Sequence, residues 1–437
     1  MTLKATSSVP RRAAISAALA VSVLWPAAIA EAQQDTAMTL RELAVSRGIV
    51  VGAAVTFPGG GPGGANAEDR PEYERVLKRE FNGVVAENAM KFQNLSRTER
   101  GVYNFGPGDE LIAFAEANNM KVRGHTLVWH SQAPTWFNEL TGDAASRDTT
   151  LKIMKRHIDT VMGRWRGKIF EWDVVNEVIA QNGGPSPNYR STSNNASYVS
   201  QWFNRVGGPD YIDSAFVYAH RADSTALLYL NDFGGEFMNA KSDNVYDLVK
   251  GLVERKIPIH GVGLQCHFNV SGGALDTAAI RQNIRRIAAL GLRVSLTEID
   301  IQHGNSGTPT TAQLETQKEK YKALMTVCVT EPSCKSFFTW GVNDNQSWRR
   351  PQASTAPLLF TGTTAITPKP AYFGVVEALQ AAPAVAVHGV APAPRATAAA
   401  MRRVSHGGVI GAEDARRTLR DLRGRSLPAS VRRAMQP

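Results

Sequence analysis

The sequence predicts a (β/α)₈ barrel, and three observations lead to that fold class. Short apolar runs alternate with amphipathic stretches along the chain. The runs are continuously rich in Val, Ile and Leu, as parallel strands buried on both faces are. There are eight of them, the number that closes a barrel, and a chain of 437 residues is long enough for one. A doubly wound sheet usually has fewer strands and a glycine-rich phosphate turn.

The expected elements follow one another in strict alternation. The strands are predicted at Gly48–Ala54, Gly83–Ala86, Lys121–Trp129, Ile169–Asn176, Ala226–Asn231, Gly261–His267, Arg293–Glu298 and Ser336–Trp340. Apolar spacing typical of helices covers Asp109–Asn119, Thr149–Trp165, Tyr211–Ala222, Ser242–Lys256, Thr277–Leu290, Ala312–Cys328 and Ala371–Gln380. The run 57–65 is rich in glycine but lacks the G-x-G-x-x-G spacing of a nucleotide site, so we expect a flexible loop.

The first 32 residues have the features of an export signal. Arg11 and Arg12 precede the apolar run 13–30, and Ala30-Glu31-Ala32 offers a cleavage site. Pro26 and the small residues after it argue against a stable membrane span. The sequence therefore predicts a secreted or periplasmic protein, exported by the Sec route or, given the adjacent arginines, the twin-arginine route. After removal of the signal we expect no membrane association.

The net charge of +10 is concentrated at the two ends of the chain. Residues 383–437 hold ten arginines against three acidic residues, and their Ala, Pro and Arg content predicts a disordered tail. The body at 33–382 keeps a balance of only +1, which does not call for a nucleic-acid partner. We expect one folded domain over 33–382, and a monomer.

The chain has three cysteines. Cys328 and Cys334 are close in sequence, and an exported chain meets oxidising conditions, so we expect them to form a disulfide. Cys266 is then left over. It is predicted on a strand between Gln265 and His267, with its side chain on the opposite face, where a buried thiol is expected rather than a nucleophile.

Two glutamates are the first candidates for chemistry. Glu177 and Glu298 each close an apolar, β-branched stretch, so each carboxylate should emerge at the C-terminal end of a strand. In a parallel barrel this is the end that carries active sites. Two carboxyl groups facing one cleft can cleave a glycosidic bond. The alternative for each, taken alone, is a surface residue that follows a strand.

Several motifs in order along the chain resemble those of glycoside hydrolase family 10, whose best-known members are endo-β-1,4-xylanases. The motifs are E-N-A-M-K at 87–91, G-H-T-L-V-W-H at 124–130 with Gln132 and Pro134, D-V-V-N-E at 173–177, G-L-Q-C-H at 263–267, T-E-I-D at 297–300, W-G-V at 340–342 and S-W-R at 347–349. The resemblance covers roughly residues 40–382. It implies a (β/α)₈ barrel and a retaining endo-1,4-β-xylanase that acts on a polysaccharide, xylan.

The resemblance gives the two glutamates different roles. Glu177 is expected to be the acid/base and Glu298 the nucleophile, with their carboxyl groups about 5–5.5 Å apart and their pKa values pushed apart. His267 is expected near Glu298, where a donor favours the ionised carboxylate. Asp300 lies two residues further along and is expected to orient His267.

The remaining site residues would bind the sugar. Asn176 is expected to contact the 2-hydroxyl. The residues expected to bind or support the glycone and the reacting sugar are Glu87, Asn88, Lys91, His125, Gln132 and Gln265, and the sugar platforms would be Trp129, Trp340 and Trp348. Trp172 and Trp202 are predicted to be core. His125 and His130 could pair on a metal, but no third ligand has suitable spacing, so we expect no metal and no cofactor.

The sequence departs from the family pattern after the fifth strand. Where the pattern is N-D-Y-N, this chain has Asn231-Asp232-Phe233-Gly234. The missing tyrosine hydroxyl and asparagine amide face the leaving-group side, so we expect intact cleavage but weaker or altered binding there. Phe92 stands where tryptophan is common, and Asn343 where threonine is usual.

Two alternatives remain at this point. One is a hydrolase on the same barrel that acts on β-glucans or on xylose-containing oligosaccharides. The other is a non-catalytic glycan-binding protein. The presence of both Glu177 and Glu298 counts against a binder, because binding alone needs neither.

Overall fold

A computed structural model describes residues 38–57, 69–181, 184–191, 199–304, 308–349 and 356–383. The expected signal at 1–32, the loop 57–65 after its first residue and the tail 383–437 after its first residue lie outside the described residues. Among the described helices, none is long and apolar enough to span a bilayer.

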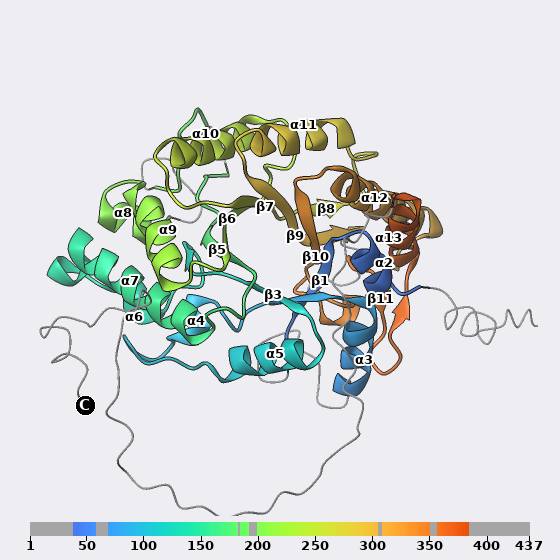
Figure 1. The fold of residues 1–437 in the computed structure, drawn as a ribbon, viewed down its shortest axis with the longest axis horizontal. Coiled ribbons are helices and arrows are strands. Elements are labelled where there is room, and N and C mark those ends of the chain that lie inside the picture. The colour runs from blue at the N-terminus through green and yellow to red at the C-terminus, as the bar shows by residue number, and fades with distance from the viewer. Residues whose placement is uncertain are drawn as a thin grey trace, which may run out of the picture. The chain divides into compact units, whose positions relative to one another are not determined.

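Eight parallel strands form a closed ring, which confirms the predicted barrel (Figure 1). In order around the ring they are β1 (Val50–Val55), β2 (Gly83–Ala86), β3 (Lys121–Gly124), β5 (Glu171–Asn176), β6 (Leu227–Asp232), β7 (Gly261–Leu264), β9 (Arg293–Gln302) and β10 (Cys334–Thr339). The ring closes where Val50 to Ala53 of β1 pair with Ser336 to Thr339 of β10. All strands therefore present their C-terminal ends at one mouth.

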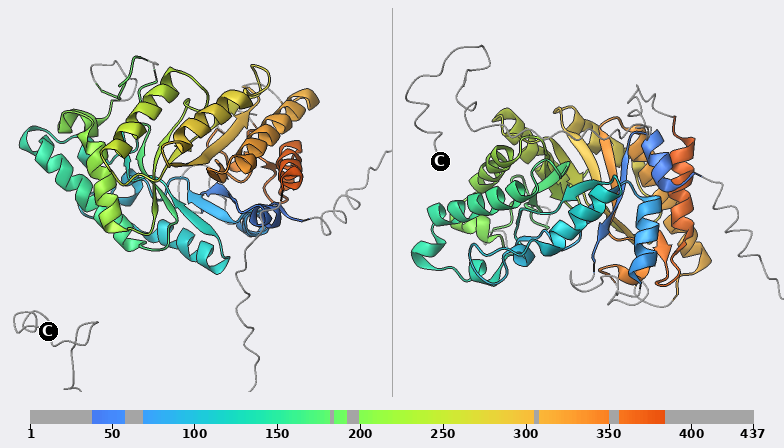
Figure 2. Two further views of the ribbon diagram at one scale, coloured as in Figure 1. Left: turned by 45° about the horizontal axis from the view of Figure 1, so that its top comes forward. Right: turned by 60° about the horizontal axis from the view of Figure 1, so that its bottom comes forward.

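The helices lie outside the strands, as the views in Figure 2 show. They include α3 (Arg70–Glu80), α5 (Gly106–Ala117), α7 (Arg147–Arg164), α9 (Asp210–Ala222), α10 (Ala240–Glu254), α11 (Thr277–Ala288), α12 (Thr311–Thr330) and α13 (Pro370–Ala381). Shorter helices are α2 (Leu40–Ser46), α4 (Phe92–Leu95), α6 (Thr135–Asn138) and α8 (Gln201–Val206). The expected helices are all present with small shifts at their ends. The sequence analysis missed the four shorter helices and also α3, whose buried apolar residues are only Tyr73, Val76 and Leu77.

Two predicted strands are each divided in the structure. The run 121–129 forms β3 and then a short β4 (Val128–Trp129), which pairs with β5. The run 261–267 forms β7 and then β8 (His267–Asn269), which pairs with β9. Between β7 and β8, Cys266 has a φ of 62°, which breaks the extended ladder. Cys266 is therefore not on a strand, but its thiol is free and buried as expected.

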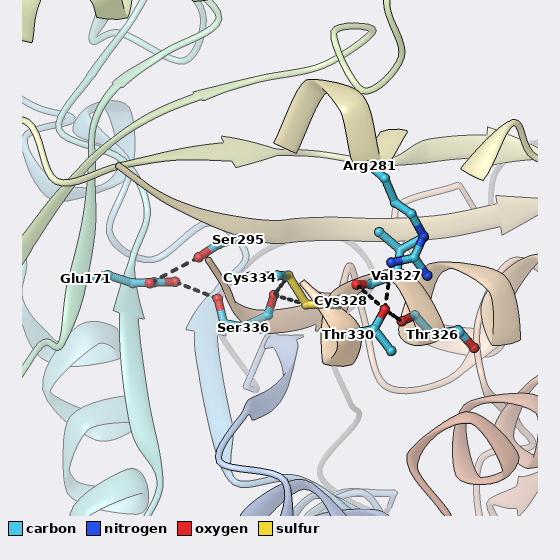
Figure 3. The surroundings of a disulfide bond; sticks show 9 residues. All are labelled: Glu171, Arg281, Ser295, Thr326, Val327, Cys328, Thr330, Cys334 and Ser336. Atoms are coloured by element: carbon cyan, nitrogen blue, oxygen red, sulfur yellow. Dashed lines mark hydrogen bonds between the residues drawn. A yellow bond between two sulfur atoms is a disulfide. The ribbon is translucent and has the colours of Figure 1, made fainter. Parts of the chain in front are cut away.

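The expected disulfide joins Cys328 of α12 to Cys334, the first residue of β10 (Figure 3). It closes a short loop, with a sequence separation of 6. Such a link stabilises the fold mainly by restricting the unfolded chain. It fixes the connection by which the last barrel strand enters the ring.

Polar side chains occupy part of the barrel interior, which the apolar pattern did not predict. Arg123 is fully buried and its Nε donates to Glu171 Oε1 at 2.9 Å. Ser336 Oγ donates to the same oxygen at 3.1 Å, and Ser295 Oγ to Oε2 at 3.3 Å (Figure 3). Arg123 also donates both terminal amino groups to Asp173. Burying these charges is tolerable because each is paired and hydrogen-bonded.

Candidate active site

A pocket of about 600 Å³ lies at the mouth of the barrel. Its lining contains every predicted site residue except Asp300: Glu87, Asn88, Lys91, His125, Trp129, Gln132, Asn176, Glu177, Gln265, His267, Glu298, Trp340 and Trp348. Gln181, Phe233 and Arg349 complete it. Residues distant in sequence converge here because the barrel brings the C-terminal ends of its strands together.

The backbone places the two glutamates differently. Glu177 directly follows β5, as predicted, and its φ of 55° turns the chain out of the strand while its N–H donates to Asn231 O at 2.8 Å. Glu298 does not close its strand, contrary to the prediction. β9 continues to Gln302 because β8 provides a partner for Asp300 to Gln302.

Positive and donor groups surround the Glu298 carboxylate. Asn231 Nδ2 donates to Glu298 Oε1 at 2.7 Å. His267 Nε2 lies 3.4 Å from Oε2, and His125 Nδ1 lies 3.8 Å from Oε1. Burial opposes ionisation, but His125, His267 and Lys91 together bring the pKa of Glu298 below its ordinary value. The carboxylate is therefore ionised at neutral pH.

His267 carries a positive charge beside Glu298. Its Nδ1 lies 3.1 Å from Asp300 Oδ2, as the sequence analysis expected. Burial disfavours the charged ring, but Asp300 and Glu298 raise the pKa of His267 to about 10. Asp300 is itself buried behind the pocket, where it accepts hydrogen bonds from Trp348 Nε1 at 2.8 Å and Arg349 Nε at 3.0 Å. Asp300 thus orients the imidazolium without lining the pocket.

The Glu177 carboxyl has a different environment. Trp129 Nε1 donates to its Oε2 at 3.0 Å and Gln265 Nε2 to its Oε1 at 3.1 Å. Burial is the main cause that raises the pKa of Glu177, and the negative charges of Asp232 and Glu298 raise it further. Two carboxyl groups in one pocket therefore have pKa values shifted in opposite directions.

Amide side chains connect the two glutamates. Asn231 Nδ2 lies 2.7 Å from Glu298 Oε1 and 2.9 Å from Asn176 Oδ1. Gln265 Nε2 lies 3.1 Å from Glu177 Oε1 and 3.3 Å from the same Asn176 oxygen. The sequence analysis did not select Asn231 as a site residue. The signal for it was present, because Asn231-Asp232 match the first two positions of the N-D-Y-N pattern.

Glu87, Asn88 and Lys91 of the E-N-A-M-K motif line one wall of the pocket. Lys91 Nζ donates to Asn88 Oδ1 at 3.1 Å, and Asn88 Nδ2 donates to Glu87 Oε1 at 3.2 Å. Gln132 Nε2 reaches the same Asn88 oxygen at 3.4 Å. Lys91 Nζ also lies 5.0 Å from the centre of the Trp129 ring. This wall presents a linked row of donors and acceptors.

The tryptophans divide as predicted. Trp129 and Trp340 line the pocket, and Trp348 does so with 47% of its surface exposed. Trp172 and Trp202 are core residues, each 1% exposed. Flat apolar rings beside polar groups suit a ligand with both apolar faces and hydroxyl edges, such as a pyranose.

The departing segment forms the wall beside Glu177. Phe233 lines the pocket, and Lys241 Nζ lies 3.5 Å from the centre of its ring and 2.9 Å from Asp232 Oδ1. Gly234 has a φ of 71° and carries no side chain into this region. The sequence analysis missed Lys241 and Arg190, because Lys241 belongs to a helix and Arg190 to a polar loop without a recognised motif.

The structure contains one cluster with possible metal ligands among the described residues. His125, Asp173 and Glu298 have donor atoms within 4.8 Å of one another. Asp173, however, already accepts both terminal amino groups of Arg123, and His125 Nδ1 lies 2.8 Å from Asp173 Oδ2. We interpret the cluster as a charge network. His130 is not in it, and its Nε2 lies instead 4.0 Å from Glu177 Oε2.

A second hollow of about 430 Å³ lies outside the barrel, lined by parts of α3 and α13. Its two buried or paired carboxylates, Glu377 and Glu80, already have partners. Glu377 pairs with Lys318 at 2.8 Å and Lys322 at 2.7 Å, and Glu80 accepts from Tyr372 Oη at 2.9 Å. The barrel mouth is therefore the better candidate for acid–base chemistry.

Comparisons with known proteins place these features in a family. Residues 39–378 match the model of "Glycosyl hydrolase family 10". The chain is 35% identical over 319 residues to "Endo-1,4-beta-xylanase B" of Thermotoga neapolitana, which covers 71% of this chain and 84% of that protein. It is 37% identical over 328 residues to "Exoglucanase XynX" of Acetivibrio thermocellus, covering 72% of this chain but only 28% of that protein.

Solved structures agree with the sequence comparisons. Xylanase 10B from Thermotoga petrophila RKU-1, solved in complex with xylobiose, superimposes with a TM-score of 0.69 at 34% identity. The match covers 79% of this chain and 98% of that structure. The shared barrel thus extends over nearly the whole of that enzyme.

Proposed function

The chain belongs to glycosyl hydrolase family 10, and we propose that it is an endo-1,4-β-xylanase, which hydrolyses internal β-1,4-xylosidic bonds of xylan with retention of configuration. The observation that carries this function is the pair of buried carboxyl groups at the barrel mouth, one with a raised and one with a lowered pKa. Retaining hydrolysis needs one protonated and one ionised carboxyl group at the same sugar.

In the first step Glu298 is the nucleophile. Its carboxylate oxygen bonds to the anomeric carbon while Glu177 donates a proton to the leaving glycosidic oxygen. The raised pKa of Glu177 keeps that proton available at neutral pH. His267 and Asn231 hold the Glu298 carboxylate ionised and oriented from two sides.

In the second step Glu177 acts as the base. Glu298 is neutral once it is esterified, so one of the two charges that raise the pKa of Glu177 is gone. Glu177 then takes a proton from a water molecule, and the water oxygen attacks the anomeric carbon. The ester bond breaks, Glu298 becomes a carboxylate again, and two inversions give net retention.

Binding of the sugar chain falls to the walls of the pocket. The linked side chains of Glu87, Asn88 and Lys91 offer hydrogen bonds to hydroxyl groups of the glycone. Asn176, between the two glutamates, is placed to bond the 2-hydroxyl of the reacting sugar. Trp340 and Trp348 provide apolar platforms.

The names of two relatives indicate different substrates, since one is a xylanase and the other an exoglucanase. We favour xylan because the xylanase also matches over most of its own length. The test is to incubate the protein without residues 1–32 with xylan, cellulose and an aryl β-xylobioside, alongside Glu298→Ala. Release of xylo-oligosaccharides by the parent but not by the variant supports the proposal. Faster release from cellulose would favour the β-glucanase, and equal activity of both proteins would remove Glu298 as the nucleophile.

We also propose that the protein is exported by its first 32 residues and works as a monomer. The first part rests on the signal-like sequence alone. N-terminal sequencing of protein recovered from the periplasm or medium should begin at or near Gln33, and light scattering should give the mass of one chain. Full-length protein in the cytoplasm, or a dimer mass, would contradict these two expectations respectively.

A further inference from the structure

Arg190 is a buried cation beside Glu177 whose hydrogen-bonding capacity is largely unused. The residue is 2% exposed and its Nε donates to the backbone oxygen of Glu177 at 2.7 Å. Its two terminal nitrogens, Nη1 and Nη2, have no hydrogen-bond partner in the described part of the chain. Buried arginines normally use these groups in forked bonds to carboxylates. Two unfilled amino groups in a buried guanidinium therefore call for an explanation.

One of the two unfilled nitrogens lies near the carboxyl group of the acid/base. Arg190 Nη2 lies 4.0 Å from Glu177 Oε2, which is too long for a hydrogen bond but close for a pair of charges. The backbone contact holds the guanidinium in this place whatever the protonation state of the carboxyl group. A neutral carboxyl gains little from a nearby cation, whereas a carboxylate gains much.

The other ionisable groups that face Glu177 come from several elements around the mouth. They are Lys91 before α4, His130 after β4, Asp232 at the end of β6 and Glu298 in β9, and Lys241 in α10 lies beside Asp232. Burial, with help from Arg190 and Lys241, lowers the pKa of His130 to about 3, so this imidazole is neutral. Lys241 is 2.9 Å from Asp232, and Lys91 contributes to the ionisation of Glu298. Arg190 differs from them in being a cation within 4.0 Å of the Glu177 carboxyl group.

The reaction proposed above moves one negative charge across the pocket. In the first step the Glu177 proton goes to the glycosidic oxygen, the bond from that oxygen to the anomeric carbon breaks, and Glu298 forms the ester. The negative charge has then left Glu298, which has cationic neighbours, and lies on Glu177. Glu177 is close to the negatively charged Asp232. Without a partner, a carboxylate buried beside another carboxylate is costly.

We propose that Arg190 is the positioning residue that holds Glu177 in place and stabilises its carboxylate while the sugar is bound to Glu298. This inference rests on the acid/base role proposed for Glu177. When the carboxylate forms, a small movement brings Oε2 within hydrogen-bond distance of Nη2, and the amino groups that are unfilled in the free enzyme gain their partner. The carboxylate is then held ready to take a proton from water.

Removal of the positive charge should slow the second step more than the first. We expect Arg190→Met to lower kcat about tenfold on dinitrophenyl β-xylobioside, a substrate whose leaving group needs no proton and whose turnover is limited by the second step. KM should fall in parallel because the glycosyl-enzyme accumulates. On xylan, the basic limb of the kcat/KM profile should move up by about one pH unit, because loss of the cation makes Glu177 a weaker acid.

Arg190→Lys and Arg205→Met are the matched controls. Arg190→Lys keeps the charge, so it should retain the basic limb of the parent although it loses the forked geometry. Arg205 donates to the backbone oxygens of Phe137 and Asn138, away from the pocket, so Arg205→Met should lower the melting temperature without moving the limb. If Arg190→Met does not fold, Arg190→Lys and Arg190→Gln give the same comparison of a charged and a neutral side chain.

The outcomes separate this inference from the proposed function. An Arg190→Met or Arg190→Gln variant that is folded, with an unmoved basic limb and kcat and KM unchanged on the aryl substrate, overturns the role of Arg190. So does an Arg190→Lys variant whose limb moves as far as that of the neutral variants. Full xylan activity in Glu177→Ala would instead remove the acid/base assignment itself. If the substitution changes activity only on a substrate that carries a carboxylate group, Arg190 binds that substrate and its proposed role toward Glu177 is overturned.

Discussion

On one side of the barrel mouth Glu298 faces two imidazoles and a lysine, whereas on the other side Glu177 faces Asp232 and the charge of Glu298 itself. The side chains are chemically identical and both are buried. The first environment lowers the pKa of its carboxyl group and the second raises it. Burial raises the pKa of both carboxyl groups, and the neighbouring charges decide which group stays ionised as the nucleophile and which keeps its proton as the acid.

The largest effect should follow from removing the carboxylate on the cationic side. We expect Glu298→Gln to lower kcat on xylan on the order of 10⁵-fold, because no covalent intermediate can form. Steady-state release of reducing sugar, with a lower limit set by contaminating enzyme, measures the loss. Glu80→Gln changes a carboxylate of α3 outside the pocket and should leave kcat within about twofold of the parent. A Glu298→Gln variant that keeps more than a tenth of the parent activity would contradict the role of Glu298 as the nucleophile.

A smaller effect should follow on the acidic side. We expect Glu177→Ala to lower kcat/KM on xylan about 10³-fold, but to leave the first step on dinitrophenyl β-xylobioside nearly unchanged, because this leaving group needs no acid. Added azide should restore turnover of the aryl substrate by attacking the glycosyl-enzyme in place of activated water. Equal losses on both substrates, with no response to azide, would mean that Glu177 does not act as acid and base.

The charge on His267 should set the acidic limb of the pH profile. The pKa of His267 is raised to about 10, so the ring is positive throughout the working range and favours ionised Glu298. His267→Gln removes that charge, which should raise the pKa of Glu298 and move the acidic limb of kcat/KM up by about one pH unit. The basic limb, which reports Glu177, should move much less. A profile with only the basic limb displaced would contradict the assignment of His267 to Glu298.

The smallest effect concerns the wall beside Glu177. Phe233→Tyr restores a hydroxyl group that the family pattern has at this position, and we expect it to lower KM for xylo-oligosaccharides a few-fold with little change in kcat. Product analysis from xylotetraose to xylohexaose measures the change in aglycone binding. Phe233→Leu is the control, since it removes the ring without adding a donor and should raise KM. An unchanged KM in Phe233→Tyr would show that the departure from the pattern has no consequence for binding.

Much of the fold and of the pocket could be predicted from the sequence, because both rest on local patterns. The eight apolar runs gave the barrel, and motifs at the strand ends gave the side chains that line the mouth. The end of β9 could not be predicted, since it depends on pairing with β8, which is a contact between segments.

The charge partners across the barrel also could not be predicted from local sequence patterns. Arg123 meets Glu171 from a neighbouring strand, and Arg190 meets Glu177 from a loop without a motif. Lys241 reaches Asp232 from α10, which carries a helical pattern that by itself indicates only a surface helix. Such pairs are decided by which elements the closed ring brings together, and no spacing within one segment reveals them.

The central claim, that Glu298 is ionised and attacks the sugar, is tested most directly by trapping its ester. Incubation with the dinitrophenyl glycoside of 2-deoxy-2-fluoro-β-xylobiose should inactivate the enzyme with release of one equivalent of dinitrophenol. Mass spectrometry of the intact protein should show one added fluoroxylobiosyl group, and peptide mapping should place it on Glu298. A label on Glu177 or on another residue, or sustained turnover without any label, would contradict the role of Glu298 as the nucleophile.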